Sequence, residues 1–131
     1  MMRNAILWIL RLVAAVIMLQ TLFFKFTGAE DSIYIFTQIG MEPWGRYAIG
    51  TGELIAGILL LVPSFSWLGA IGGIGLMAGA VFFHLTIIGI EVKDDGGTLF
   101  IMALAVLISC IINVAMEKGK LVRFVNNMLK R

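Results

Sequence analysis

Apolar residues dominate three stretches of the chain that contain no Asp, Glu, Lys or Arg: residues 12–24, 54–90 and 96–116. A helix needs about 20 residues to cross the hydrocarbon core of a bilayer. The last stretch therefore predicts one membrane-spanning helix, over about 98–116.

The middle stretch is long enough for two crossings, and Pro63, which removes a backbone donor, interrupts it together with the serines that follow. It predicts two helices joined by a tight hairpin, over about 47–62 and 67–90. The first stretch, extended by the apolar residues that precede Arg11, predicts a helix over about 5–25. The pattern thus predicts an all-α integral membrane four-helix bundle that forms a single domain over residues 1–131.

A secretory signal peptide is the alternative interpretation of the N-terminal stretch. Arg3 and Arg11 accompany an apolar run, and residues 27–29 have the small side chains of a cleavage site. We favour a membrane-spanning helix because no exported soluble domain follows this stretch.

The last residues, about 119–131, have a different pattern. Apolar side chains recur there at helical spacing, and basic and amide side chains fill the remaining face. This pattern predicts a C-terminal amphipathic helix that lies in the interface of the cytoplasmic leaflet, with its bases toward anionic head groups. A frayed basic tail is the alternative.

The basic residues also predict the orientation in the membrane. With four spans, both termini and the Pro63 hairpin share one face, which holds seven bases: Arg3, Arg11, Lys118, Lys120, Arg123, Lys130 and Arg131. The other face holds three: Lys25, Arg46 and Lys93. Six acidic residues fall in its two loops: Glu30, Asp31, Glu42, Glu91, Asp94 and Asp95. Because cytoplasmic loops carry the excess of Lys and Arg, we expect both termini in the cytoplasm.

Composition excludes several classes of protein. Apolar residues make up 60% of the 131 residues and charged residues 14%, whereas soluble domains carry about 25% charged residues. A soluble domain and a disordered chain are both excluded by this balance. The net charge of +2 is too small and scattered to indicate nucleic-acid binding. The single cysteine, Cys110, excludes disulfide frameworks and cysteine metal sites, and we expect it to be a buried apolar side chain.

Three polar residues are predicted to lie at related depths in the outer half of the bundle. Lys25 ends the first helix, while Glu53 and His84 each lie about six residues, roughly 9 Å, from the same surface on the second and third helices. Ionisable groups inside a membrane need a partner or a water-filled cavity. We predict that Lys25, Glu53 and His84 form a ligand-binding or proton-relay site. The alternative is an ion pair with a hydrogen-bonded histidine that only fastens three helices together.

Two further polar features carry weaker hypotheses. His84 and Glu91 share a helix face, but the chain has no second histidine, so no metal site is predicted. Arg11 lies about two turns into the first helix, from where it can extend to the lipid phosphates, with Asn113 as a hydrogen-bonding partner.

The third predicted helix is rich in glycine. Gly69 with Gly73, and Gly75 with Gly79, repeat a four-residue spacing of small residues that lets membrane helices approach closely. We expect close packing within the bundle, and a homodimer interface is the alternative.

Several of these segments resemble the DoxX-like family of four-helix membrane proteins. The resemblance rests on residues 25–28 (KFTG), 50–57 (GTGELIAG), 59–63 (LLLVP), 79–80 and 84–85, with Arg11 opening the first helix. It implies a four-helix bundle in the bacterial cytoplasmic membrane. It also implies association with oxidoreductase partner subunits, since the family is named for a subunit of a thiosulfate:quinone oxidoreductase. Quinone is the cofactor that this resemblance favours.

Three functions follow as hypotheses. The first is a redox-linked membrane subunit whose outer-leaflet pocket binds a quinone-like or other lipophilic ligand. The second is a proton-coupled protein that binds or transports a small solute or lipid. The third is a non-catalytic membrane assembly subunit in which the polar cluster only stabilises the fold.

Overall fold

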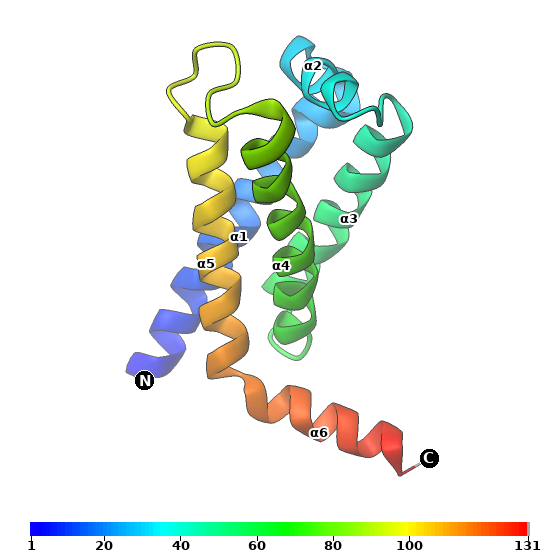
Figure 1. The fold of residues 1–131 in the computed structure, drawn as a ribbon. Coiled ribbons are helices and arrows are strands. Elements are labelled where there is room, and N and C mark those ends of the chain that lie inside the picture. Colours follow the sequence, from blue (N-terminus) through cyan, green and yellow to red (C-terminus); the bar gives the residue numbers. More distant parts are fainter. Residues whose placement is uncertain (131) are drawn as a thin grey trace.

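The computed structural model describes residues 1–130, and Arg131, the last residue of the predicted tail, lies outside the described residues. The described chain is helical, with no strand (Figure 1). Its elements are α1 (Met2–Thr27), α2 (Glu30–Gln38), α3 (Trp44–Leu61), α4 (Ser66–Phe83), the π-helical turn η1 (His84–Ile88), α5 (Thr98–Met116) and α6 (Lys118–Leu129).

Four long helices form the bundle. They follow one another around it in the order α1, α3, α4 and α5, and each packs against two neighbours. Both termini and the α3–α4 hairpin lie at one end, which we name the termini end (Figure 1). Helix α2 and the segment 89–97 lie at the opposite end, which we name the loop end.

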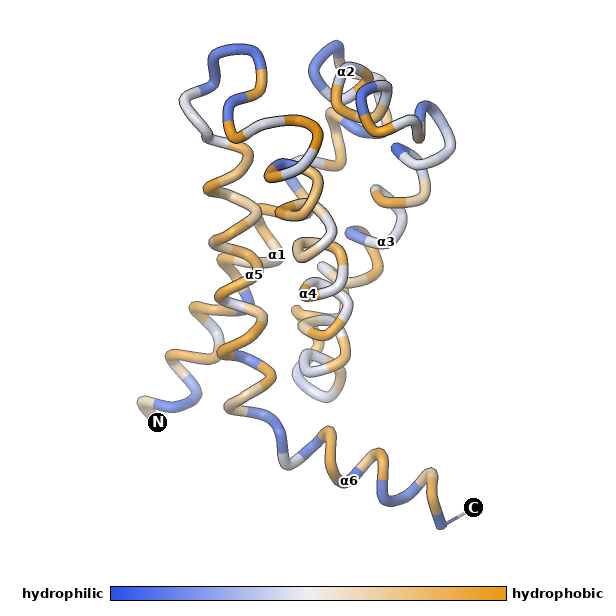
Figure 2. The backbone as a smooth tube through the Cα atoms, in the orientation of Figure 1, coloured by the Kyte–Doolittle hydropathy of each residue, from blue (hydrophilic) through white to orange (hydrophobic). Residues whose placement is uncertain are grey.

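Three of these helical segments are long and apolar enough to cross a membrane. They are Met2–Thr27, Ser66–Ile88, in which η1 continues α4, and Thr98–Met116. Helix α3 has 18 residues and carries Arg46 and Glu53, which keep it outside this group. The chain is therefore an all-α membrane protein, and the count of four spans stays a prediction. Hydrophobic residues line the middle of the bundle, and hydrophilic residues gather in the loops and along α6 (Figure 2).

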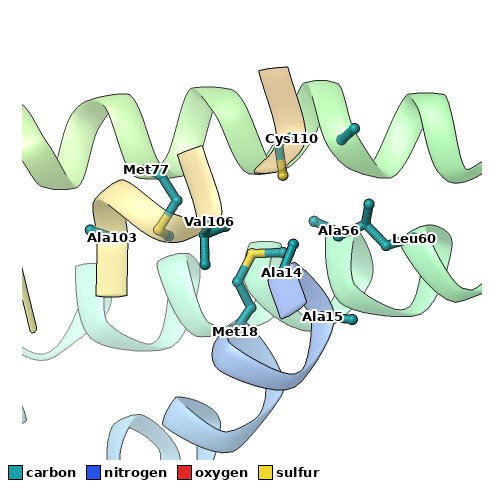
Figure 3. Packing of buried hydrophobic residues seen from close by; sticks show 10 residues of the cluster. Ala14, Ala15, Met18, Ala56, Leu60, Met77, Ala103, Val106 and Cys110 are labelled. Atoms are coloured by element: carbon teal, nitrogen blue, oxygen red, sulfur yellow. The ribbon is translucent and has the colours of Figure 1, made fainter. Parts of the chain in front are cut away.

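Small and flexible side chains fill the centre of the bundle. Met18 and Leu60 are fully buried there among alanines, and Val106 and Cys110 complete the contact from α5 (Figure 3). The expected burial of Cys110 is confirmed. Small residues let membrane helices approach closely, and dispersion contacts then stabilise the packing.

The glycines of α4 divide into two kinds. A Cβ at Gly69 would lie 2.6 Å from the backbone nitrogen of Leu60, and one at Gly73 would lie 2.7 Å from the sulfur of Cys110. A Cβ at Gly75 or Gly79 would have no atom within 4 Å. The first pair therefore permits close packing inside the bundle, as expected, while the second pair borders open space.

Helix α2 was not predicted, because residues 26–46 read as a loop. Helix α1 ends at Gly28, whose φ of +72° reverses the chain direction. Glu30 and Asp31 then occupy the first turn of α2, where negative charge is favourable at a helix N-terminus. The result is a short helix that lies across the loop end of the bundle.

A tight turn precedes α5 at the place where the sequence predicts one. Asp95 Oδ1 accepts hydrogen bonds from the backbone N–H groups of Val92 (3.0 Å) and Gly97 (2.8 Å), and Oδ2 accepts one from Leu99 (3.3 Å). Burial alone would raise the pKa of Asp95, but these three bonds hold that pKa below its ordinary value.

The C-terminal segment is helical, which confirms the predicted amphipathic helix. Helix α6 leaves the bundle at the termini end and runs across its base (Figure 1). Its apolar side chains, among them Val122, Met128 and Leu129, are exposed. Its place on a membrane leaflet stays a prediction.

Candidate functional site

A cavity of about 640 Å³ lies in the half of the bundle toward the loop end. All four bundle helices line it, and so do α2 and η1. Small-molecule sites generally occupy 300–1,000 Å³, with mostly apolar walls and a few polar groups. This cavity fits that description, because aliphatic, aromatic and Met side chains form most of its wall. Its polar and charged residues are Thr21, Lys25, Glu30, Asp31, Ser32, Glu53 and His84.

Two glycines of α4 help to create this space. Gly75 and Gly79 line the cavity, and neither has an atom near its missing Cβ position. Their spacing suggested helix packing, but here it leaves room beside the polar residues. The homodimer interface stays a prediction.

An ion pair joins α1 to α3 at the cavity wall. Lys25 Nζ lies 2.9 Å from Glu53 Oε1, and the Glu53 side chain is 3% exposed. Lys25 also donates a hydrogen bond to Thr21 Oγ1 at 3.3 Å. The Thr21 hydroxyl has two acceptors within reach, Glu53 Oε2 at 3.3 Å and the Met18 carbonyl at 2.8 Å. The Lys25 ammonium therefore keeps a buried carboxylate in its charged form beside an apolar space.

His84 lines the same cavity but does not join this ion pair. Its Nδ1 lies 2.9 Å from the Gly89 carbonyl, and its ring meets Phe100 edge to face at 5.6 Å. A carbonyl only accepts hydrogen bonds, so Nδ1 carries a proton and Nε2 is the nitrogen left to exchange one. Within residues 1–130, no hydrogen bond links His84 to Lys25 or Glu53.

The backbone around His84 is itself unusual. His84 begins η1, a single π-helical turn that Gly89, with a φ of +91°, brings to an end. Single π turns inside helices occur mostly at functional sites, because the extra residue redirects side chains. The π turn gives a structural reason for the position of His84 that sequence spacing could not supply.

Arg46 is a buried residue that the sequence analysis counted only as a loop charge. Its Nε lies 3.0 Å from both carboxylate oxygens of Glu42, and Nη1 donates to the carbonyl of Lys25. Its guanidinium also lies 4.5 Å from the centre of the Tyr47 ring. Arg46 therefore fixes the end of α1 against α3 and holds the backbone of Lys25 in place. The i, i+4 spacing of Glu42 and Arg46 is the signal that could have found it.

The acidic residues of α2 face a base from the other loop. Lys93 Nζ lies 3.3 Å from Glu30 Oε1 and 3.3 Å from Asp31 Oδ1, and 5.2 Å from the ring centre of Tyr34. Burial alone would lower the pKa of Lys93, but the two carboxylates raise it above its ordinary value. The two loops are thus joined beside the cavity.

A second polar cluster lies at the termini end. Arg11 is buried and forms an ion pair with Glu117 at 2.9 Å. Glu117 Oε1 also accepts a hydrogen bond from Ser66 Oγ at 2.6 Å, and Lys120 Nζ lies 2.9 Å from Oε2. The expected extension of Arg11 toward lipid phosphates was wrong, because a buried carboxylate at the α5–α6 junction neutralises it.

The expected bond between Arg11 and Asn113 was also wrong. Asn113 is 1% exposed, and neither of its amide atoms has a hydrogen-bond partner among residues 1–130. Glu117 was missed because it lies at the predicted end of a span, where it read as an exposed charge. Burial alone would raise the pKa of Glu117, but hydrogen bonds from Ser66, Arg11 and Lys120 hold it below the ordinary value of 4.5.

Comparisons with known proteins give one family. The DoxX family model matches residues 6–86, which is more than half of the chain and includes Lys25, Glu53 and His84. The chain matches none of the curated proteins and none of the solved structures with which it was compared.

Proposed function

Because the chain belongs to the DoxX family, we propose that it is a membrane subunit of a bacterial redox system that binds a quinone-like lipophilic molecule in the cavity. The observation that carries this proposal is the ionised Lys25–Glu53 pair in the wall of a largely apolar space of about 640 Å³. A purely structural ion pair has no need of such a space beside it.

The cavity fits the chemistry of such a ligand. A quinone-like molecule combines an apolar ring and tail with carbonyl oxygens that accept hydrogen bonds. Lys25 offers donors at the polar part of the wall, and Phe24, Phe83 and Met102 are among the apolar residues that could enclose a ring. The walls would exclude water and so strengthen the polar contacts.

Each polar residue has a distinct role in this proposal. A bound quinone supplies two-electron chemistry, in which it takes up two electrons and two protons. Lys25 would orient a carbonyl oxygen, while His84 Nε2 and the Glu53 carboxylate would hold and pass protons. The electrons must come from a partner oxidoreductase subunit, since Cys110, the single cysteine, is buried and has no thiol partner.

The proposal includes an orientation in the bacterial cytoplasmic membrane. The excess of Lys and Arg at the termini end supports a cytoplasmic position for that end. The cavity would then lie in the outer half of the membrane, where partner subunits outside the cytoplasm could reach it.

Thermal unfolding of the detergent-solubilised protein tests the proposal. A soluble ubiquinone or menaquinone analogue at 100 times its Kd should stabilise the wild type by about 2.7 kcal/mol. Glu53→Gln should lose most of this stabilisation. Glu91→Gln removes the same charge from an exposed residue outside the cavity and is the matched control.

Mass spectrometry of the purified wild type gives a second measurement that does not depend on a variant. A co-purifying quinone would support the proposal. If the protein carries no quinone and no analogue shifts its melting temperature, the proposed function is wrong.

A further inference from the structure

A second hollow lies at the termini end, between the α3–α4 hairpin and α6. This groove has a volume of about 470 Å³. Pro63 and Trp67 belong to its hairpin side, and Lys120, Arg123, Phe124 and Asn127 belong to its α6 side. We name it the hairpin groove. It shares no residue with the cavity beside Lys25 and Glu53.

The hairpin groove carries an excess of positive charge. Lys120 Nζ lies 2.9 Å from Glu117 Oε2 and donates to the Pro63 carbonyl at 3.1 Å. Glu117 must also neutralise the buried Arg11, so one carboxylate serves two cations. Arg123 is exposed, and no acidic side chain among residues 1–130 lies within ion-pair distance of it. The groove therefore lacks one anion.

The opposite wall of the groove is apolar. The rings of Trp67 and Phe124 meet with their centres 5.2 Å apart, and Phe65 and Leu68 lie beside them with large exposed surfaces. Exposed apolar side chains at this level continue along α6. A ligand that matches both walls has an anionic group next to an aliphatic chain.

We propose that the hairpin groove binds one anionic phospholipid, whose phosphate contacts Arg123 and Lys120. Its acyl chain would lie along Trp67 and Phe124. Guanidinium and ammonium groups bind phosphate oxygens by charge-assisted hydrogen bonds, and Asn127 adds an amide donor. Basic pockets between helices on the cytoplasmic side of membrane proteins are suited to such head groups. A free phosphate ion would leave the apolar wall without a partner, so we assign the site to a lipid.

This inference does not depend on the proposed function, and it gives α6 a role. The helix has only 12 residues, and its contacts with the bundle gather near its N-terminal half, at Lys120 and Phe124. A lipid bound between α6 and the hairpin would fasten the helix to the bundle and to the bilayer together. The groove would thus prefer anionic to zwitterionic lipids.

Native mass spectrometry of the full chain tests the proposal. The probes are dioleoyl phosphatidylglycerol and dioleoyl phosphatidylcholine, which share acyl chains and differ in net charge. The wild type should retain one phosphatidylglycerol more strongly than phosphatidylcholine. Arg123→Gln should weaken that retention about fivefold, as expected for one basic contact of about 1 kcal/mol.

Lys118→Gln is the matched control, because Lys118 is an exposed base of the same helix outside the groove. It should leave retention unchanged, and Arg123→Lys should restore most of it. Equal losses in Arg123→Gln and Lys118→Gln would mean diffuse surface charge and would overturn the proposal. Equal retention of the two lipids would overturn it as well. Displacement of the lipid by 10 mM inorganic phosphate, about the highest concentration needed, would show an ion site and reject the assignment to a lipid.

Discussion

Alanine substitutions in α4 should have opposite effects on stability at two glycines that the sequence presents in the same way. Gly69 and Gly79 both belong to pairs of small residues four positions apart in one helix. A Cβ at Gly69 would lie 2.6 Å from the Leu60 nitrogen and 2.7 Å from the Ala56 oxygen, both of them backbone atoms. A Cβ at Gly79 would enter the cavity without contact.

The expected sizes follow from two opposing contributions. Replacing glycine by alanine inside a helix lowers the entropy of the unfolded chain and stabilises by roughly 0.5–1 kcal/mol. Overpacking costs about 1–3 kcal/mol, and backbone atoms at Gly69 leave the upper part of that range. We therefore expect Gly69→Ala to destabilise the protein by about 2 kcal/mol and Gly79→Ala to stabilise it by about 0.5–1 kcal/mol.

Reversible unfolding in mixed micelles with a rising fraction of SDS measures this difference. Gly72→Ala is the control, because its Cβ would make an ordinary contact of 3.5 Å with Ala56. It should be neutral or slightly stabilising. If Gly79→Ala destabilises as strongly as Gly69→Ala, α4 is packed at both positions and the cavity beside Gly79 does not exist.

Two further predictions concern the ion pairs. Glu117→Gln leaves Arg11 buried without its carboxylate, so the free energy of unfolding should fall by about 3 kcal/mol. The folded-state pKa of Glu117 lies below 4.5, so its stabilisation is present above that pH and is lost as the pH falls. Wild-type melting temperatures should therefore decline below about pH 4.5, with a smaller decline in Glu117→Gln, and equal declines would contradict the assignment. Lys93→Ala should lower stability by less than about 1 kcal/mol, because its carboxylate partners are exposed. That loss should shrink in 0.5 M salt, roughly the range in which exposed charges are screened, and a loss that persists would mean a buried interaction.

The long helices and the Lys25–Glu53 contact could be predicted because both follow from hydrophobic pattern and depth. A helix rises by a fixed distance per residue, so two charges at equal depth on neighbouring antiparallel helices come within reach. Neither the rotation of a helix about its axis nor the local π turn is visible in spacing alone. For that reason His84 was predicted at the right end of the bundle, yet with the wrong partners.

Residues at the ends of helices were the main failures of prediction. Glu117 and Arg46 both lie where a span meets a predicted loop, and an isolated charge there reads as exposed. Their burial depends on elements that cover them, namely α6 for Glu117 and the segment before α3 for Arg46. Helix α2 was missed for a related reason, because nine residues with modest hydrophobicity give little periodic signal.

The two halves of α4 show why sequence spacing identifies a packing surface without saying what packs on it. The pair at Gly69 and Gly73 faces the backbone of α3 and the small side chain of Cys110, so the helices close tightly there. Four residues beyond Gly75, at Gly79, no side chain fills the space in front of the helix. The tight half fixes the helices at the termini end, and the same rigid helix then keeps its other half apart from its neighbours. A cavity beside a charged pair is thus a consequence of close packing elsewhere along one helix, and a substitution that loosened Gly69 should also change the shape of the cavity.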